Sequence, residues 1–328
     1  MTEKNVIQTI HDTLHEELKA DHRVLVLGED VGARGGVFRA TANFLEEFGP
    51  DRIIDTPLAE SGIVGVAIGM ALNGLLPVAE IQFADFIHPA FDQLVSEAAR
   101  IRYRSAGDWN VPLVVRAPYG GGVHGALYHS QSIEAFYGHV PGLKVVVPAT
   151  PRDAKGLLHA AIRDPDPVLY LEHKKTYRLI KGEVPDEPYE TPIGVADVKR
   201  SGEHLTVVSY GMMLHYCLEA AERLQEEDGL SAEVVDVRTI SPLDKETILT
   251  SVRKTAKAMV VYEDNRTYGA GAEIAATIAE ELLFELDGPI VRMGGPDIPA
   301  MPFSSPLEHA YMLDPQRIYA RMRELARF

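Results

Sequence analysis

The chain has 328 residues, which at roughly 150 residues per domain predicts two domains. Apolar residues make up 46% and charged residues 24%, an ordinary globular composition that excludes a largely disordered chain. Acidic residues outnumber basic ones by 48 to 32, and the net charge of −16 argues against a nucleic-acid-binding protein. The single cysteine, Cys217, excludes an internal disulfide and a cysteine-cluster metal site, and it indicates a reducing compartment.

The amino terminus and one uncharged stretch bear on location. Residues 1–10 lack the apolar core of a signal peptide, so we expect a cytoplasmic protein. Residues 61–79 carry no charge and approach the length of a bilayer span. Asn73-Gly74 followed by Pro77 is typical of a turn between a helix and a strand, so we expect no membrane span there.

Helical and strand patterns alternate along the first 180 residues. Val6, Ile10, Leu14 and Leu18 form one helical stripe, and four further helices are expected at 38–48, 62–72, 86–103 and 153–162. Short apolar strands are expected at 24–27, 53–54, 78–81, 111–115, 144–147 and 168–171. Alternation of this kind predicts an α/β fold, a doubly wound parallel sheet covered by helices on both faces.

Residues 181–191 interrupt the alternation. They hold Pro185, Pro188 and a run of acids, which is typical of an exposed connector. Beyond them, strands are expected at 205–209, 232–237, 258–262 and 290–292, and helices at 214–225, 271–286 and 315–326. We therefore predict two α/β domains, residues 1–190 and 191–328.

Glu60 stands where a strand gives way to an apolar helix. An acid in this position usually satisfies free amides at the start of the helix. The alternative is a carboxylate held in a dry cleft, where it exchanges a proton or binds a ring nitrogen. The following helix is apolar on all sides, which predicts burial. Gly62, Gly65 and Gly69 bare one of its faces, so another backbone or subunit could approach closely.

The glycine-rich stretch 119–125 lacks the sequence of a phosphate-binding loop. No Lys-Ser or Lys-Thr follows it, and its glycines do not fit the dinucleotide fingerprint. A mobile loop that carries His124 and His129 to a site fits better, although most loop histidines are simply solvated. The sequence has no Gly-x-Ser-x-Gly elbow, which argues against a serine hydrolase.

Six segments, in this order, resemble the beta subunit of the decarboxylating component of 2-oxo acid dehydrogenase complexes. They are Gly28-Glu29-Asp30-Val31, Asp55-Thr56-Pro57 through Glu60, Ala79-Glu80-Ile81-Gln82-Phe83, His129-Ser130-Gln131-Ser132, Pro141-Gly142-Leu143-Lys144-Val145-Val146 and Asp153-Ala154-Lys155-Gly156-Leu157. The likeness is weaker beyond Val195, where Ser241-Pro242-Leu243-Asp244 and Glu263-Asp264-Asn265 carry it.

The resemblance implies a transketolase-like pyrimidine-binding domain followed by a transketolase C-terminal domain. It implies thiamine diphosphate bound at an interface with an alpha subunit, in an alpha-two beta-two heterotetramer. In the family the alpha chain holds the diphosphate and Mg²⁺ through a Gly-Asp-Gly motif. Here Gly107-Asp108-Trp109 breaks that motif, so we expect this chain to supply half of the cofactor site.

The resemblance also assigns residues. Glu60 matches the acid that bonds pyrimidine N1′ and favours the imino tautomer, which removes the thiazolium C2 proton. Glu29 matches an acid near the same ring, Gln82 and Phe86 match residues lining the pyrimidine and acyl pocket, and His129 matches a histidine at the active-site mouth. A loop that binds K⁺ in some members is matched by Leu113, Ala161, Ile162, Asp164 and Asp166, the last of which is often Asn in the family.

The implied reaction is oxidative decarboxylation of a 2-oxo acid, with acyl transfer to the lipoyl group of an acyltransferase. Gln82 and the run 129–136 are more similar to the branched-chain subgroup than to the pyruvate subgroup. Pyruvate and acetoin dehydrogenases remain alternatives, because the alpha chain also shapes the acyl pocket. Two further alternatives are a non-catalytic scaffold of the same fold and a split transketolase-type enzyme acting on sugars.

Overall fold

The computed structural model describes residues 1–328, which form two compact units. The first unit comprises Met1–Tyr119 and Phe136–Ile193, and the second comprises Gly120–Ala135 and Gly194–Phe328. The division at Ile193 lies close to the connector expected from the sequence. The segment Gly120–Ala135, however, groups with the second unit although it interrupts the first in the chain.

The first unit contains a parallel sheet in the order β6-β7-β5-β4-β2-β3. Its strands are β2 (Val24–Gly28), β3 (Ile53–Asp55), β4 (Leu76–Glu80), β5 (Val114–Tyr119), β6 (Lys144–Val146) and β7 (Val168–His173). A separate antiparallel pair joins β1 (Thr2–Asn5) to β8 (Lys181–Val184). Because the six strands are parallel, the residues that follow β2, β3 and β4 meet at one edge of the sheet.

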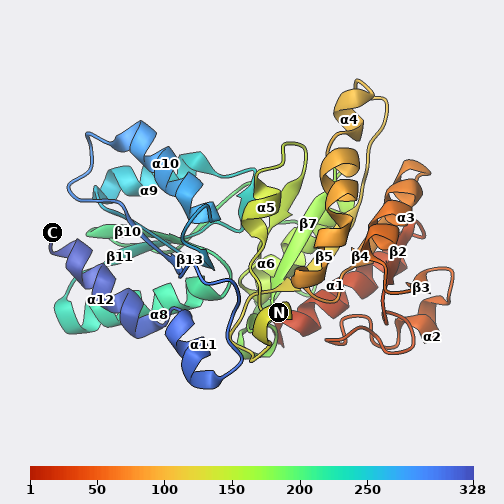
Figure 1. Ribbon diagram of the computed structural model, residues 1–328, viewed down its shortest axis with the longest axis horizontal. Helices are drawn as coiled ribbons and strands as arrows, with labels where there is room; N and C mark the ends of the chain where they lie inside the picture. The colour runs from red at the N-terminus through yellow and green to blue at the C-terminus, as the bar shows by residue number, and fades with distance from the viewer. The chain divides into compact units, whose positions relative to one another are not determined.

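Helices cover both faces of this sheet (Figure 1). One face carries α1 (Val6–Ala20), α6 (Pro151–Arg163) and α7 (Thr176–Leu179), and the stripe Val6, Ile10, Leu14 and Leu18 of α1 is buried in the core. The other face carries α3 (Glu60–Leu72) and the helical turns that follow β4. The remaining helical segments are α2 (Phe44–Phe48), η1 (Ala84–Phe86), η2 (His88–Ala90), η3 (Gln93–Ala98), α4 (Ile101–Arg104) and α5 (Glu134–Gly138).

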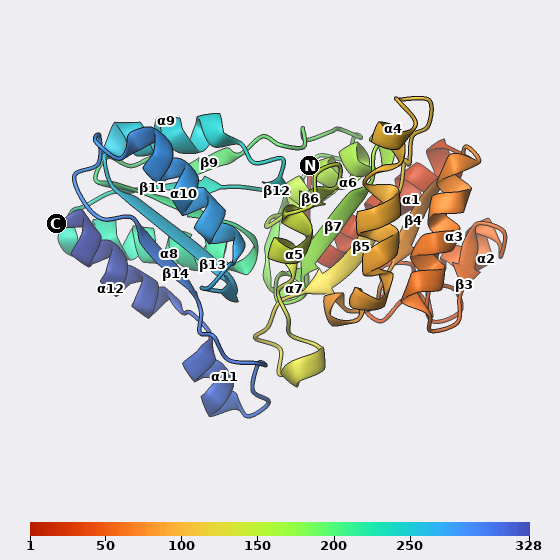
Figure 2. The same cartoon turned by 45° about the horizontal axis from the view of Figure 1, so that its top comes forward.

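The second unit contains a five-stranded sheet in the order β14-β13-β10-β11-β9, parallel except for β9. Its strands are β9 (Asp197–Arg200), β10 (Leu205–Ser209), β11 (Ala232–Asp236), β13 (Ala258–Asn265) and β14 (Val291–Gly295), and β12 (Thr239–Ser241) follows β11. Helices α8 (Gly211–Asp228) and α12 (Pro315–Ala326) pack together on one face, and α9 (Lys245–Thr255) and α10 (Ala270–Leu282) on the other. The unit also contains η4 (Ala126–Tyr128) and α11 (Ser305–Tyr311) (Figure 2).

The α/β fold expected from the sequence is confirmed, but two expected helices are wrong in part. The long helix at 86–103 is instead divided among η1, η2, η3 and α4, and Pro89 lies in the first turn of η2, where it has no amide hydrogen to donate. In the expected helix 38–48 only the last turn is helical. Arg39 and Asn43 adopt positive φ angles of 70° and 68°, which a continuous α-helix does not accommodate.

Two further expectations need correction. Helix α3 is not buried all round in this chain: Gly62, Gly65 and Gly69 are exposed, and Val66 beside them is 54% exposed. The expected connector 181–191 begins with a strand, β8, whose Val184 is fully buried. No helix of the chain is both long enough and apolar enough to cross a bilayer.

Candidate functional site at one edge of the first sheet

The site lies where β2, β3 and β4 end. Gly28 is the last residue of β2 and lies opposite Asp55 on one side and Glu80 on the other. A Cβ atom on Gly28 would lie 2.5 Å from the carbonyl oxygen of Glu80, so only glycine permits this close approach. The strand end therefore delivers Glu29 and Asp30 directly against the residues that follow β4.

Glu60 is the first residue of α3. The N-cap position is Ala59, and no side chain caps the helix, so Glu60 is not the cap that its position in the sequence first indicates. The Glu60 side chain is half-buried and has no hydrogen-bond or ion-pair partner within the chain. A carboxylate held in this way is available to a group from outside the chain.

Glu29 and Gln82 lie at the same edge. The Gln82 side-chain amide donates to Oδ2 of Asp30 at 3.2 Å and to the backbone oxygen of Glu29 at 3.5 Å. Burial, together with the negative charges of Asp30 and Glu60, raises the pKa of Glu29. Phe86 meets Phe83 edge to face, with ring centroids 6.1 Å apart. The structure thus gathers four of the predicted residues, Glu29, Glu60, Gln82 and Phe86, around three adjacent strand ends.

The loop after β2 is held by Asp55, which sequence reasoning quoted in a motif without giving it a role. Its Oδ1 accepts from the amide of Gly32 at 2.6 Å, and its Oδ2 accepts from Ala33 at 3.3 Å. Gly36 lies against Glu80, where a Cβ would be 2.8 Å from Oε1. These contacts fix the path of the loop that begins with Glu29 and Asp30.

Sequence reasoning also missed a charged network beneath this edge. Arg116 of β5 is 1% exposed and donates to Glu172 of β7 at 2.6 and 2.9 Å and to Glu80 of β4 at 2.8 Å. Tyr177 donates to Oε2 of Glu172 at 2.5 Å. Burial opposes the charge on Arg116, but Glu172 and Glu80 raise its pKa overall. The sequence does hold a signal for this network, because each of three adjacent and mainly apolar strands contains one charged residue, and buried charges need partners.

His129 belongs to the second unit, whereas the other predicted catalytic and cofactor-binding residues belong to the first. It follows η4, and its backbone amide donates to Ala126 at 3.5 Å. Its side chain is half-buried. The glycine-rich stretch before it forms a compact loop, in which the amide of Gly120 donates to the backbone oxygen of Gln131 at 3.0 Å.

The residues predicted to hold K⁺ meet around the turn that joins α6 to β7. Leu113, Ala161 and Ile162 are buried, and the carbonyl oxygen of Leu113 accepts from the amide of Val168 at 2.9 Å. Both carboxylates at this turn already face cations, because Lys144 contacts Asp164 at 2.5 Å and Arg102 pairs with Asp166. Oxygen ligands left for an ion are therefore mainly backbone carbonyls.

Two further features of the chain concern ligand binding. Nowhere in residues 1–328 do three or more His, Cys, Asp or Glu side chains form a group able to hold a metal ion. A hollow of about 630 Å³ opens at the start of α1 and includes none of the predicted site residues. It is lined by Thr2, Glu3, Lys4, Asn5, Ile7, Gln8, His11, Asp12, Phe38, Arg39 and Arg178.

Comparison with known proteins gives two family matches and close full-length relatives. Residues 3–180 match "Transketolase, pyrimidine binding domain", and residues 194–318 match "Transketolase, C-terminal domain". The chain is 58% identical to the 2-oxoisovalerate dehydrogenase subunit beta of Bacillus subtilis, over 100% of both chains. It is 52% identical to the pyruvate dehydrogenase E1 component subunit beta of the same organism, over 93% of each.

A solved structure described as a split gene transketolase, an inactive beta4 tetramer, has a similar fold. The TM-score is 0.79, and the match covers 98% of both chains at 24% sequence identity. At that level of identity the likeness concerns the fold alone.

Proposed function

Because this chain belongs to the family of beta subunits of 2-oxo acid dehydrogenase E1 components, we propose that it works with an alpha subunit in the oxidative decarboxylation of a branched-chain 2-oxo acid. The acyl group then passes to the lipoyl group of an acyltransferase. The branched-chain assignment is supported by the 58% identity to the 2-oxoisovalerate relative along the entire chain. Pyruvate is the second candidate, because the pyruvate relative is 52% identical.

The observation that carries the proposal is the placement of Glu60. Its half-buried carboxylate lacks a partner within the chain and lies at the strand edge that also holds Glu29 and Gln82. This arrangement fits the pyrimidine half of thiamine diphosphate, which needs a carboxylate at a ring nitrogen and polar groups at the ring edge. When bound, thiamine diphosphate supplies the electron sink for decarboxylation.

The residues of this chain then have distinct roles. Glu60 holds a proton at pyrimidine N1′, and its effect on the rate is that of a positioned acid–base group. Gln82 and Phe86 orient the ring and the acyl chain, and Glu29 keeps the ring edge polar. His129 serves the later transfer to the lipoyl group. Mg²⁺ and the diphosphate are assigned to the alpha subunit of an alpha-two beta-two assembly, and K⁺ is assigned to the backbone carbonyls around Leu113, Ala161 and Ile162.

Co-expression with an alpha subunit of this family tests the proposal. The purified mixture should decarboxylate 2-oxo acids with branched side chains at a higher kcat/KM than pyruvate, and it should acylate a lipoyl domain. A mixture that turns over pyruvate best would favour the second candidate. Activity on ketose phosphates, or assembly without any turnover, would contradict both.

The isolated chain provides a second test. Since it lacks the Gly-Asp-Gly motif that holds the diphosphate in the family, we expect it to be inactive alone. Calorimetric titration of the purified chain with thiamine diphosphate and Mg²⁺ should give no saturable binding, whereas the alpha–beta mixture should bind. Tight binding by the isolated chain would contradict the division of the cofactor site between two subunits.

A further inference from the structure

The loop that carries His129 is built into the second unit. Residues Gly120–Ala135 follow β5 of the first unit in the chain, yet they group with Gly194–Phe328. Figure 2 shows this loop, which contains η4, on the side of the second unit where α11 lies. Residues 194–328, the C-terminal domain, contain none of the residues predicted for catalysis. Their contacts with this loop are therefore a way in which that domain can affect His129.

Two buried carboxylates of the C-terminal domain hold the first part of the loop. Glu263 of β13 accepts through Oε1 from the backbone amide of Gly121 at 2.6 Å. Glu308 of α11 accepts through Oε1 from the amides of Gly122 and His124, each at 3.1 Å. Oε2 of Glu308 lies 2.6 Å from Nδ1 of His124. Glu263 and Glu308 are 7% and 3% exposed, so both carboxylates are buried acceptors of charge-assisted hydrogen bonds.

The end of the loop is held from the same unit. The hydroxyl of Tyr210 donates to Oε1 of Glu134 at 2.8 Å, and Glu134 is fully buried. Burial, and the nearby charge of Asp264, raise the pKa of Glu134, which favours a neutral acid at this end. Both ends of the loop are thus tied to elements of the C-terminal domain.

Between these ties the backbone has little freedom. His124 and Ala126 adopt positive φ angles of 58° and 56°, so the chain turns sharply on both sides of Gly125. A Cβ on Gly125 would lie 2.5 Å from the carbonyl oxygen of His129. The glycine therefore allows the turn to pack directly against the backbone of His129.

We propose that Glu308 and Glu263 are positioning residues that act through the 121–125 backbone to hold His129 for acyl transfer to the lipoyl group. This inference rests on the role of His129 in the proposed function. It gives the C-terminal domain a direct part in the second half-reaction. Glu308 is the more decisive of the two, because its single carboxylate fixes two amides and one side chain.

The test uses the alpha–beta assembly with Glu308→Ala, Glu308→Gln and Gly125→Ala. Glu285→Ala is the matched control, since Glu285 is an exposed carboxylate of the same unit that pairs with Arg253. Two rates are compared: acylation of a lipoyl domain, and decarboxylation coupled to a dye electron acceptor. Hydrogen exchange at the amides of residues 121–124 reports the loop independently of activity.

For Glu308→Ala we expect exchange of these amides to rise by roughly ten-fold or more, because hydrogen bonds to a charged acceptor are lost. Lipoyl-domain acylation should fall about ten-fold further than dye-linked decarboxylation, which is below the roughly 10²-fold that a misplacement of about 1 Å can cost. Glu308→Gln retains an oxygen acceptor, so it should keep most of the exchange protection and most of the lipoyl-domain acylation. Gly125→Ala should reproduce the acylation defect with Glu308 intact.

The proposal would be overturned if Glu308→Ala left amide exchange at residues 121–124 unchanged and acylated the lipoyl domain as well as the Glu285→Ala control does. Equal losses of acylation and of dye-linked decarboxylation in Glu308→Ala would also overturn it. Should Glu308→Ala fail to assemble, Glu308→Gln and Gly125→Ala decide the matter. A wild-type assembly that decarboxylates no 2-oxo acid would refute the proposed function instead, and the exchange measurement would still test whether Glu308 holds the loop.

Discussion

Arg116 and Glu172 face each other in the interior of the first sheet, with Nε and Oε1 2.6 Å apart and both side chains at most 1% exposed. Glu80 meets the same guanidinium from β4, the strand that leads to Gln82. A charged network thus lies beneath the edge of the sheet that holds the candidate site, and each member is needed, because an uncompensated buried charge is costly.

Replacing Arg116 should therefore damage the fold as well as the site. We expect Arg116→Met to lower the free energy of unfolding by about 3–5 kcal/mol, the usual cost of breaking a buried pair. Urea unfolding of the purified chain measures it. Arg23→Met is the control, because Arg23 pairs with Asp21 at the surface and exposed pairs contribute about 0–1 kcal/mol. An equal decrease in the free energy of unfolding in the two variants would show that the buried network stabilises the fold no more than a surface ion pair does.

Glu60→Gln keeps the size of the side chain and removes its charge. We expect decarboxylation by the alpha–beta assembly to fall by roughly 10²–10⁴, the contribution of a positioned acid–base group. Glu46→Gln provides the matched control, since Glu46 is also an acid in the first turn of a helix, α2, and is exposed. Assembly, followed by gel filtration, should be unchanged in both. Turnover of Glu60→Gln within a few-fold of wild type would assign Glu60 a merely structural role.

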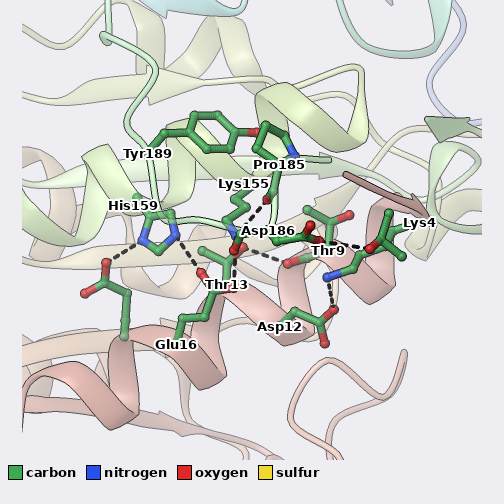
Figure 3. Close-up of polar contacts among 12 residues, drawn as sticks. Lys4, Thr9, Asp12, Thr13, Glu16, Lys155, His159, Pro185, Asp186 and Tyr189 are labelled. Atoms are coloured by element: carbon green, nitrogen blue, oxygen red, sulfur yellow. Dashed lines mark hydrogen bonds and ion pairs between the residues drawn. The ribbon is translucent and has the colours of Figure 1, made fainter. Parts of the chain in front are cut away.

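A second buried network joins α1 to α6 and to the segment after β8 (Figure 3). Nε2 of His159 lies 3.1 Å from Glu16, and Nδ1 contacts Glu17. The ammonium of Lys155 bonds Glu16 at 2.9 Å and the carbonyl oxygens of Pro185 and Asp186 at 3.2 and 3.1 Å. Because carboxylates face both ring nitrogens, the imidazolium form fits this site best.

Burial opposes the charge on His159, but Glu16 and Glu17 raise its pKa overall. A pKa raised on folding means that the native state binds the proton more tightly, so the stabilisation is complete below the unfolded pKa of about 6.5. It is lost as pH rises through the higher folded pKa. Urea midpoints measured from pH 6 upward should therefore fall more steeply in wild type than in His159→Gln. His22→Gln, which alters an exposed histidine, should follow wild type, and parallel curves for all three would contradict the argument.

The parts of this molecule that the sequence predicts well are those set by local periodicity. The stripe of α1 and the apolar runs of β2, β4 and β7 are visible in one window of sequence, and they correctly give an α/β fold. The prediction of one continuous helix at 86–103 fails because the apolar spacing continues through Pro89, whereas the backbone forms several shorter helical segments. The prediction that α3 is buried on all sides fails for another reason. Burial of its glycine face depends on what packs against that face, which the local sequence does not report.

The candidate site divides in the same way. The family resemblance points to Glu60, Gln82 and Glu29 through the motifs that contain them, and the structure brings the three to adjacent strand ends, where parallel sheets gather side chains. Asp55, Arg116 and Glu308 were missed because their roles depend on partners distant in sequence. Glu308 meets the amide of Gly122 across 186 positions, a separation no local pattern reports.

The turn between α6 and β7 brings two carboxylates close to one ammonium group. Lys144 contacts Asp164 at 2.5 Å and Asp166 at 3.9 Å, so its ammonium neutralises much of the negative charge there. In Lys144→Met two carboxylates are left with Arg102 as their remaining cation. We expect this variant to be less stable and to be stabilised more by K⁺ than the wild type is, because an ion that binds only the native state raises its stability by mass action.

Thermal unfolding in about 0.1 M KCl, compared with the same concentration of choline chloride, separates ion binding from general screening. Lys19→Met is the control, since Lys19 is an exposed cation that pairs with Glu47. The difference between the two salts should be largest for Lys144→Met and equal for Lys19→Met and wild type. If K⁺ and choline act alike on all three proteins, the turn does not bind K⁺, and the assignment of Leu113, Ala161, Ile162, Asp164 and Asp166 to an ion site fails.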